Sequence, residues 1–130
     1  MSTPVSALQP TIVADYRSAA TFQAGHFSPV PLGHTDRVKA VLSCFEPGQF
    51  IPVHTPAIDV TFVILEGEGV IVAGDQEAEV GPGAIVIVPA GAARGIKATT
   101  RLIAIHLVSP PPTEADHAEV QSKLRQGSWR

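Results

Sequence analysis

The sequence contains 130 residues, a length typical of one globular domain. Hydrophobic residues make up 45% of the chain, charged residues only 16%, and the formal net charge is −3. This composition excludes a disordered chain, because the apolar content is high and the net charge is small. The nine Lys and Arg residues form no basic run, so we expect no nucleic-acid partner. No apolar run approaches the about 20 residues that span a bilayer, so we expect no membrane partner.

The single cysteine and the first residues bear on the compartment. Cys44 by itself excludes an internal disulfide and a cysteine-rich zinc site, and its apolar neighbours predict a buried side chain rather than a nucleophile. Residues 1–10 lack the positive and apolar segments of a secretory signal. We therefore expect a cytoplasmic protein.

The N-terminal third is the least regular part of the chain. Residues 11–15 can form a short strand. Residues 22–35 carry two prolines, two glycines and two histidines, which predicts an irregular arm or loop. We assign residues 1–36 to an N-terminal arm, which can add a strand to the domain that follows or to a partner subunit.

From residue 37 the chain consists of short runs rich in Val, Ile and Phe that end at turn residues. Strands at spacings of roughly ten residues predict an all-β sandwich or barrel. Some runs, such as residues 85–88, are apolar at every position, as expected when one face lines an interior and the other packs against a second sheet or subunit. We therefore expect a homodimer. The predicted strands cover residues 38–45, 50–54, 60–65, 70–73, 76–80, 84–88, 92–98 and 101–108.

Residues 110–130 have a different character. Three prolines at positions 110–112 predict a rigid break. Thr113 is suited to cap a helix, the acidic residues that follow suit the positive end of its dipole, and Gly127 suits its end. We expect a short C-terminal helix and assign no chemistry to it.

Two segments resemble the two motifs of the cupin superfamily. In the first, Gly48 precedes His54 by five intervening residues, and Gly67 closes the segment. In the second, Gly83 is followed after five residues by Pro-Ala-Gly at 89–91 and then by Arg94. The resemblance, to a small single-domain cupin of the cupin 2 type, implies a double-stranded β-helix (jelly-roll) barrel over residues 37–109.

The same resemblance implies a degenerate metal site. Most cupins hold a divalent metal with three histidines and one glutamate. His54 occupies the first histidine position, whereas the second falls on Pro56, the glutamate on Val60 or Thr61, and the last histidine on Arg94. Proline and valine offer no ligand atom, and a fixed cation repels metals. We therefore predict no cofactor.

A substitute metal site remains as a less favoured alternative. His54, Asp59 and His106 carry the imidazole and carboxylate groups that bind Zn, Fe, Ni or Mn. Asp59 would need a bulge to reach the interior, because strand alternation otherwise points it away. Each residue also has a structural interpretation, as a core histidine, a surface carboxylate and an outward or interfacial histidine.

Arg94, which stands where the cupin motif has its last histidine, is the most informative departure from that motif. An arginine inside an apolar barrel must be paired or must bind an anion, and its planar guanidinium suits a carboxylate or phosphate. We therefore predict that His54, Asp59, Arg94 and His106 bind a small, anionic metabolite without a metal. The alternative is that Arg94 points to solvent or pairs with Asp59 in a structural role.

Two further functions stay open. One is a cupin enzyme, such as a dioxygenase, isomerase or lyase, that uses a reduced metal site or acid–base chemistry of His54 and His106. The other is a structural or interaction module whose barrel is filled by side chains, which Val60 and Ala98 at former polar positions favour.

Overall fold

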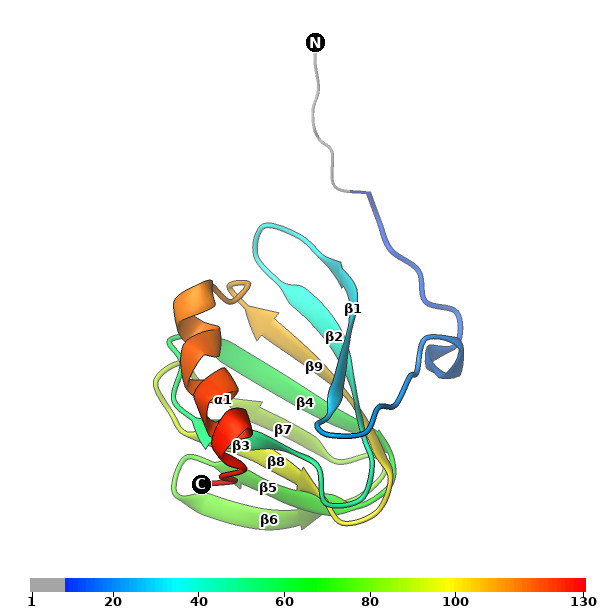
Figure 1. Cartoon of the computed structure of the whole chain (residues 1–130). Coiled ribbons are helices and arrows are strands. Elements are labelled where there is room, and N and C mark those ends of the chain that lie inside the picture. Colours follow the sequence, from blue (N-terminus) through cyan, green and yellow to red (C-terminus); the bar gives the residue numbers. More distant parts are fainter. Residues whose placement is uncertain (1–8) are drawn as a thin grey trace.

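Two antiparallel sheets of the computed structural model face each other and form a barrel (Figure 1). The structure describes residues 9–130, so the expectations for the first eight residues lie outside it. The five-stranded sheet has the order β1-β2-β9-β4-β7 and the four-stranded sheet β3-β8-β5-β6. The all-β prediction is confirmed. The strands are β1 (Ser28–His34), β2 (Lys39–Phe45), β3 (Phe50–His54), β4 (Asp59–Glu66), β5 (Gly69–Ala73), β6 (Gln76–Val80), β7 (Ile85–Val88), β8 (Arg94–Ala98) and β9 (Leu102–Ser109).

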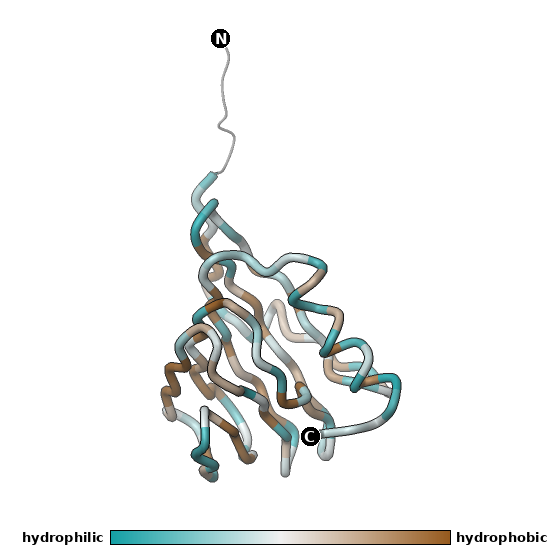
Figure 2. The backbone as a smooth tube through the Cα atoms, turned by 90° about the vertical axis from the view of Figure 1, so that its left-hand side faces the viewer, coloured by the Kyte–Doolittle hydropathy of each residue, from teal (hydrophilic) through white to brown (hydrophobic). Residues whose placement is uncertain are grey.

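The core lies between the sheets because alternate residues of each strand point inward. In β4, Val60, Phe62 and Ile64 are buried, whereas the residues between them are not. Phe45 on β2 is fully buried in the same cluster. In Figure 2 the hydrophobic colour lies mainly on the strands, and the C-terminal helix is mostly teal and white.

The N-terminal arm differs from its prediction in two places. Residues 11–15 form no strand, and the chain instead makes the short 3-10 helix η1 (Tyr16–Ser18). Residues 28–34, expected to be irregular, form β1 and pair with β2 of the same chain. Pro29 and Pro31 hid this strand. An edge strand tolerates proline because one side of it needs no ladder hydrogen bonds.

The outer face of the five-stranded sheet is only partly covered. Residues from the arm, including Tyr16 and Phe22, pack on a cluster that contains the fully buried Leu42 and Cys44. Cys44 is thus buried as predicted, and burial raises the pKa of its thiol. Beyond the arm, three large apolar side chains remain exposed among the described residues: Ile85 (65%), Ile87 (73%) and Leu107 (39%).

The predicted C-terminal helix is present as α1 (Glu114–Gln126). Thr113 precedes its first turn, where the backbone N–H of Thr113 donates to Asp116 Oδ2 at 2.8 Å. Gly127 ends the helix with a φ of 69°. Figure 1 shows α1 beside β3. None of the helices in residues 9–130 is long and apolar enough to cross a membrane.

The C-terminal tail ties α1 to the barrel. The backbone N–H of Val53 donates to the carbonyl of Trp129 at 2.9 Å, and Lys123 Nζ donates to the carbonyl of Val53 at 2.6 Å. The Trp129 ring packs directly over Gly95, where a Cβ atom would lie 2.9 Å from Cζ3. These contacts hold the helix in place although none of its residues is buried.

Candidate functional site

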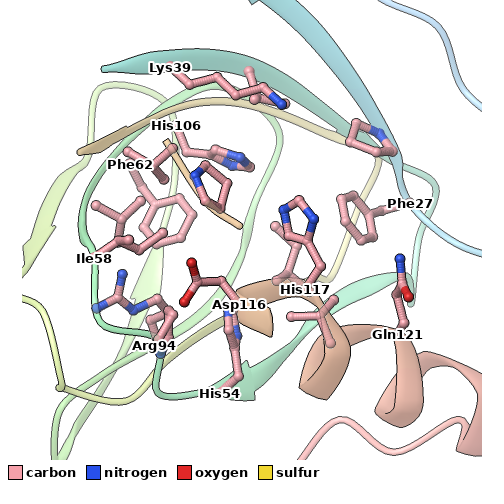
Figure 3. Close-up of a pocket in the computed structure, with 18 of the residues that line it drawn as sticks. Phe27, Lys39, His54, Ile58, Phe62, Arg94, His106, Asp116, His117 and Gln121 are labelled. Atoms are coloured by element: carbon pink, nitrogen blue, oxygen red, sulfur yellow. The ribbon is translucent and has the colours of Figure 1, made fainter. Parts of the chain in front are cut away.

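A cavity of about 440 Å³ lies between the sheets and beneath α1 (Figure 3). Its walls are mainly apolar, with Phe27, Ile58 and Phe62 among them. His106 reaches it from β9 of the five-stranded sheet, whereas His54 and Arg94 reach it from β3 and β8 of the other. The barrel is therefore not filled by side chains, contrary to the structural-module alternative.

Arg94 is the buried cation of the cavity. It is 2% exposed, and its guanidinium is held at one edge: Nη2 donates to the carbonyls of Pro89 (2.9 Å) and Ala92 (3.2 Å), and Nε donates to that of Ala92 (3.3 Å). Nη1 is buried and has no hydrogen-bond partner in the part of the chain that the structure describes. Burial lowers the pKa of Arg94, and the charge of Asp59 partly offsets this effect.

Arg94 therefore neither points to solvent nor makes an ion pair within residues 9–130. Within these residues, the carbonyl dipoles of Pro89 and Ala92 and the more distant carboxylate of Asp59 balance its charge. A buried guanidinium that lacks one partner is energetically unfavourable, and an anion in the cavity would supply the missing acceptor.

His54 lies directly across the β3–β8 ladder from Arg94. Its Nδ1 lies 2.8 Å from the carbonyl oxygen of Pro52. A carbonyl can only accept, so Nδ1 carries the hydrogen, and Nε2 of the neutral ring carries a lone pair. Burial lowers the pKa of His54; the hydrogen bond to Pro52 opposes this shift and the charge of Arg94 adds to it. His54 is thus neutral at neutral pH.

His106 is the second neutral imidazole of the cavity. Its Nδ1 lies 3.1 Å from the hydroxyl of Ser43, which is fully buried on β2. Burial, with smaller contributions from the charges of Lys39 and His54, lowers the pKa of His106 to about 4. Its ring meets that of Phe62 edge to face, with centroids 5.8 Å apart. His106 is partly buried and lines the cavity.

Asp59, the fourth predicted ligand residue, does not line the cavity. Its carboxylate is exposed and accepts a hydrogen bond from the backbone N–H of Ala90 at 2.8 Å, so it caps the turn after β7. The alternation of β4 explains this position: Val60 points inward and both of its neighbours point outward. No bulge turns Asp59 inward, because its pairing with Ser109 continues in register to Val60 and Val108.

The residues at the family's metal positions do not fit a metal. His54, Pro56, Val60 and Arg94 all line the cavity, so the positions converge as the motifs imply, but only His54 brings a ligand atom. Within residues 9–130, no three His, Cys, Asp or Glu side chains are arranged to hold a metal ion. A fixed cation at one of the four positions also opposes a divalent ion by charge repulsion.

Sequence reasoning missed the contribution of α1 to the cavity. The inner side of the helix closes one side of it, with a carboxylate, an imidazole and an amide among apolar groups. The sequence did contain a signal, because the helix residues that line the cavity are three or four positions apart and such residues lie on one face of a helix. They are Asp116, His117, Val120, Gln121 and Leu124.

Comparison with known proteins identifies the family. The family model for the cupin domain matches residues 41–108. The chain belongs to the cupin family. This cupin domain begins within β2 and ends within β9, so it contains His54, Arg94 and His106. No curated protein matches the sequence.

Solved structures agree with the jelly-roll fold. The crystal structure of TT1209 from Thermus thermophilus is 27% identical with a TM-score of 0.73, and the alignment covers 77% of this chain and 98% of that one. An RmlC-like cupin from Desulfovibrio desulfuricans is 29% identical with a TM-score of 0.66, covering 72% and 92%. KdgF from Halomonas sp., at 19% identity and a TM-score of 0.66 over 74% and 88%, shares the fold.

Proposed function

We propose that this cupin binds a small carboxylate with an apolar body inside its barrel, without a metal ion. The observation that carries the proposal is Arg94, which is 2% exposed and leaves Nη1 without a hydrogen-bond partner in the described residues. A carboxylate accepts hydrogen bonds from a guanidinium with good geometry, and the pair is strong where water is excluded.

The rest of the cavity supports a ligand whose carboxylate is attached to an apolar body. His54 and His106 are neutral at neutral pH, so they contribute polarity without charge. The walls around them are largely apolar and suit a hydrocarbon or aryl body. Lys39 also lines the cavity but is only partly buried, so Arg94 is the buried positive charge that a carboxylate would meet.

Metal independence rests on the donor set. Proline, valine and arginine occupy three of the four positions at which cupins hold their metal, as the motif alignment places them, and all three line the cavity. The guanidinium in the fourth position takes the place of the ion as the cavity's positive charge. It attracts the same class of ligand group, an oxyanion, that a metal would polarise.

The proposal is tested by thermal denaturation with pairs of ligands that differ only in charge, such as benzoate with benzamide and isovalerate with isovaleramide. A bound carboxylate at about 100 times its Kd stabilises the wild type by about 2.7 kcal/mol, and the amide does not. The response disappears in Arg94→Met. It persists in Lys97→Met, which removes an exposed cation from the opposite face of the same strand.

Two results would overturn the proposal. One is a panel of small carboxylates of which none stabilises the wild type more than its amide. The other is an Arg94→Met variant that responds as the wild type does, because the anion would then bind elsewhere.

A further inference from the structure

The cavity places a base with a free lone pair beside a cation that can hold an oxyanion. His54 has its proton on Nδ1, bound to the carbonyl of Pro52, and none of the described residues donates a hydrogen bond to Nε2. Arg94 is its cross-strand neighbour, close enough for its charge to lower the pKa of the imidazole. Ligand binding alone requires the cation but does not require an oriented, neutral base.

The two residues come from rigid neighbours, so their relative position is well defined. His54 ends β3 and Arg94 begins β8, and the two strands are paired across Ile51 and Ile96. The guanidinium is held by two backbone carbonyls, and the imidazole by one. Arg94 and His54 both line the cavity (Figure 3), so a ligand bound to Arg94 inside it lies in the same enclosed space as the imidazole.

We propose that the site catalyses proton transfer at the carbon next to the keto group of a small 2-oxo carboxylate, with His54 as the base and Arg94 as the oxyanion holder. The proposal rests on the function proposed above. Nη1 is the guanidinium nitrogen left for a ligand, so it can donate to the keto oxygen of a 2-oxo acid while the carboxylate lies beside the same cation. Its hydrocarbon or aryl end faces the apolar wall around Phe62 and Ile58.

The step balances without another reactant. Nε2 of His54 takes a proton from C3, the C–H electron pair forms the C2–C3 double bond, and the keto π electrons move to the oxygen beside Arg94. The guanidinium stabilises the charge that develops there. The imidazolium then returns a proton to C3 or to the oxygen, which gives exchange at C3 or the enol tautomer.

His106 lines the cavity from the other sheet, opposite the sheet that carries His54, and adds no charge of its own. Its pKa of about 4 leaves it neutral when His54 becomes protonated during the step. The charged groups that act on His54 are Arg94 on β8 and Glu119 and Lys123 on α1, and the rate should follow the protonation of His54.

The test measures deuterium incorporation at C3 of 2-oxobutanoate and phenylpyruvate in D₂O by proton NMR, with thermal stabilisation by the same compounds recorded in parallel. The wild type should exceed the buffer rate by about 100-fold or more, as positioned general bases do. His54→Gln should lose at least about nine-tenths of this rate yet keep the thermal stabilisation, which also shows that it folds. Arg94→Met should lose both. His34→Gln, which changes an exposed histidine outside the cavity, should keep both.

The pH profile is a second readout. Because burial lowers the pKa of His54, exchange should stay near its maximum at neutral pH and fall only in acid. Arg94-dependent stabilisation by 2-oxo acids without exchange above buffer would overturn the catalytic proposal and leave the binding proposal intact. Exchange that persists in His54→Gln, or that needs a base of pKa above 7, would overturn the role of His54. Absence of both stabilisation and exchange would overturn both proposals for this class of ligand.

Discussion

Replacing His106 by glutamine removes a buried titratable group from the cavity wall and keeps a neutral polar partner for the hydroxyl of Ser43. In the wild type that hydroxyl lies 3.1 Å from Nδ1 of His106. An amide can donate or accept in the same place, so the substitution leaves no buried polar atom unpaired. What it changes is the response of folding to acid.

The magnitude follows from the pKa of the buried imidazole. The pKa of His106 is about 4 in the folded protein, against about 6.5 in an unfolded chain. The unfolded state therefore binds more protons between these two values, and the stability due to this group is complete above pH 6.5 and lost as the pH falls toward 4. For one such group the loss between about pH 7 and pH 5 is about 2 kcal/mol. This corresponds to a fall in Tm of about 7 °C for a chain of this length.

The assay is urea denaturation of the wild type and His106→Gln at both pH values, read by far-UV circular dichroism. The wild type should lose about 2 kcal/mol more than the variant, because all other titrating groups are common to both. His34→Gln serves as the control, since it removes an exposed histidine, and should behave as the wild type does. Equal acid sensitivity of the wild type and His106→Gln would refute the argument.

Three further substitutions test packing and assembly. Gly67→Ala should destabilise the fold by about 2–4 kcal/mol, measured by urea denaturation, because φ is 82° and a Cβ would lie 1.9 Å from the carbonyl oxygen of Arg101; a loss below about 1 kcal/mol would contradict this close approach. Gly95→Ala should cost about 1–3 kcal/mol and shift the fluorescence of Trp129, the single tryptophan, to the red as its ring is displaced; an unchanged spectrum would count against the contact. We expect a homodimer through the exposed apolar side chains around Ile87 on the outer sheet face, and Ile87→Lys should convert it to a monomer in light scattering. A monomeric wild type at micromolar concentration would exclude this dimer.

Local patterns in the sequence predicted most of the secondary structure. The runs at 50–54 and 76–80 match β3 and β6 at both ends, and Thr113 and Gly127 flank α1 as predicted. These elements depend on the side-chain period and on turn or cap residues close in the chain, so the sequence contains their signals. The arm was expected to be able to add a strand to the barrel, but the position of β1 was not predicted, because its prolines are acceptable only on an edge and edge position is a property of the whole sheet.

The candidate site was only partly predictable. His54, Arg94 and His106 come together because strand alternation and pairing turn them to the same interior. Asp59 was grouped with them by its place in the sequence, one residue from the inward Val60, and that one residue turns it to the opposite face. The helix residues Asp116 and His117 meet the cavity only through the way α1 folds back on β3.

The sequence by itself determined that this protein is a cupin barrel with an arginine where a metal ligand is usual, because glycine, proline and alternation patterns are local and the motifs are spaced along one chain. Only the tertiary structure decided that Arg94 is buried with Nη1 unpaired among residues 9–130, that His54 carries its proton on Nδ1, and that a C-terminal helix closes the cavity. Burial, tautomer and cavity shape depend on contacts between residues far apart in the chain, and no local pattern encodes those contacts.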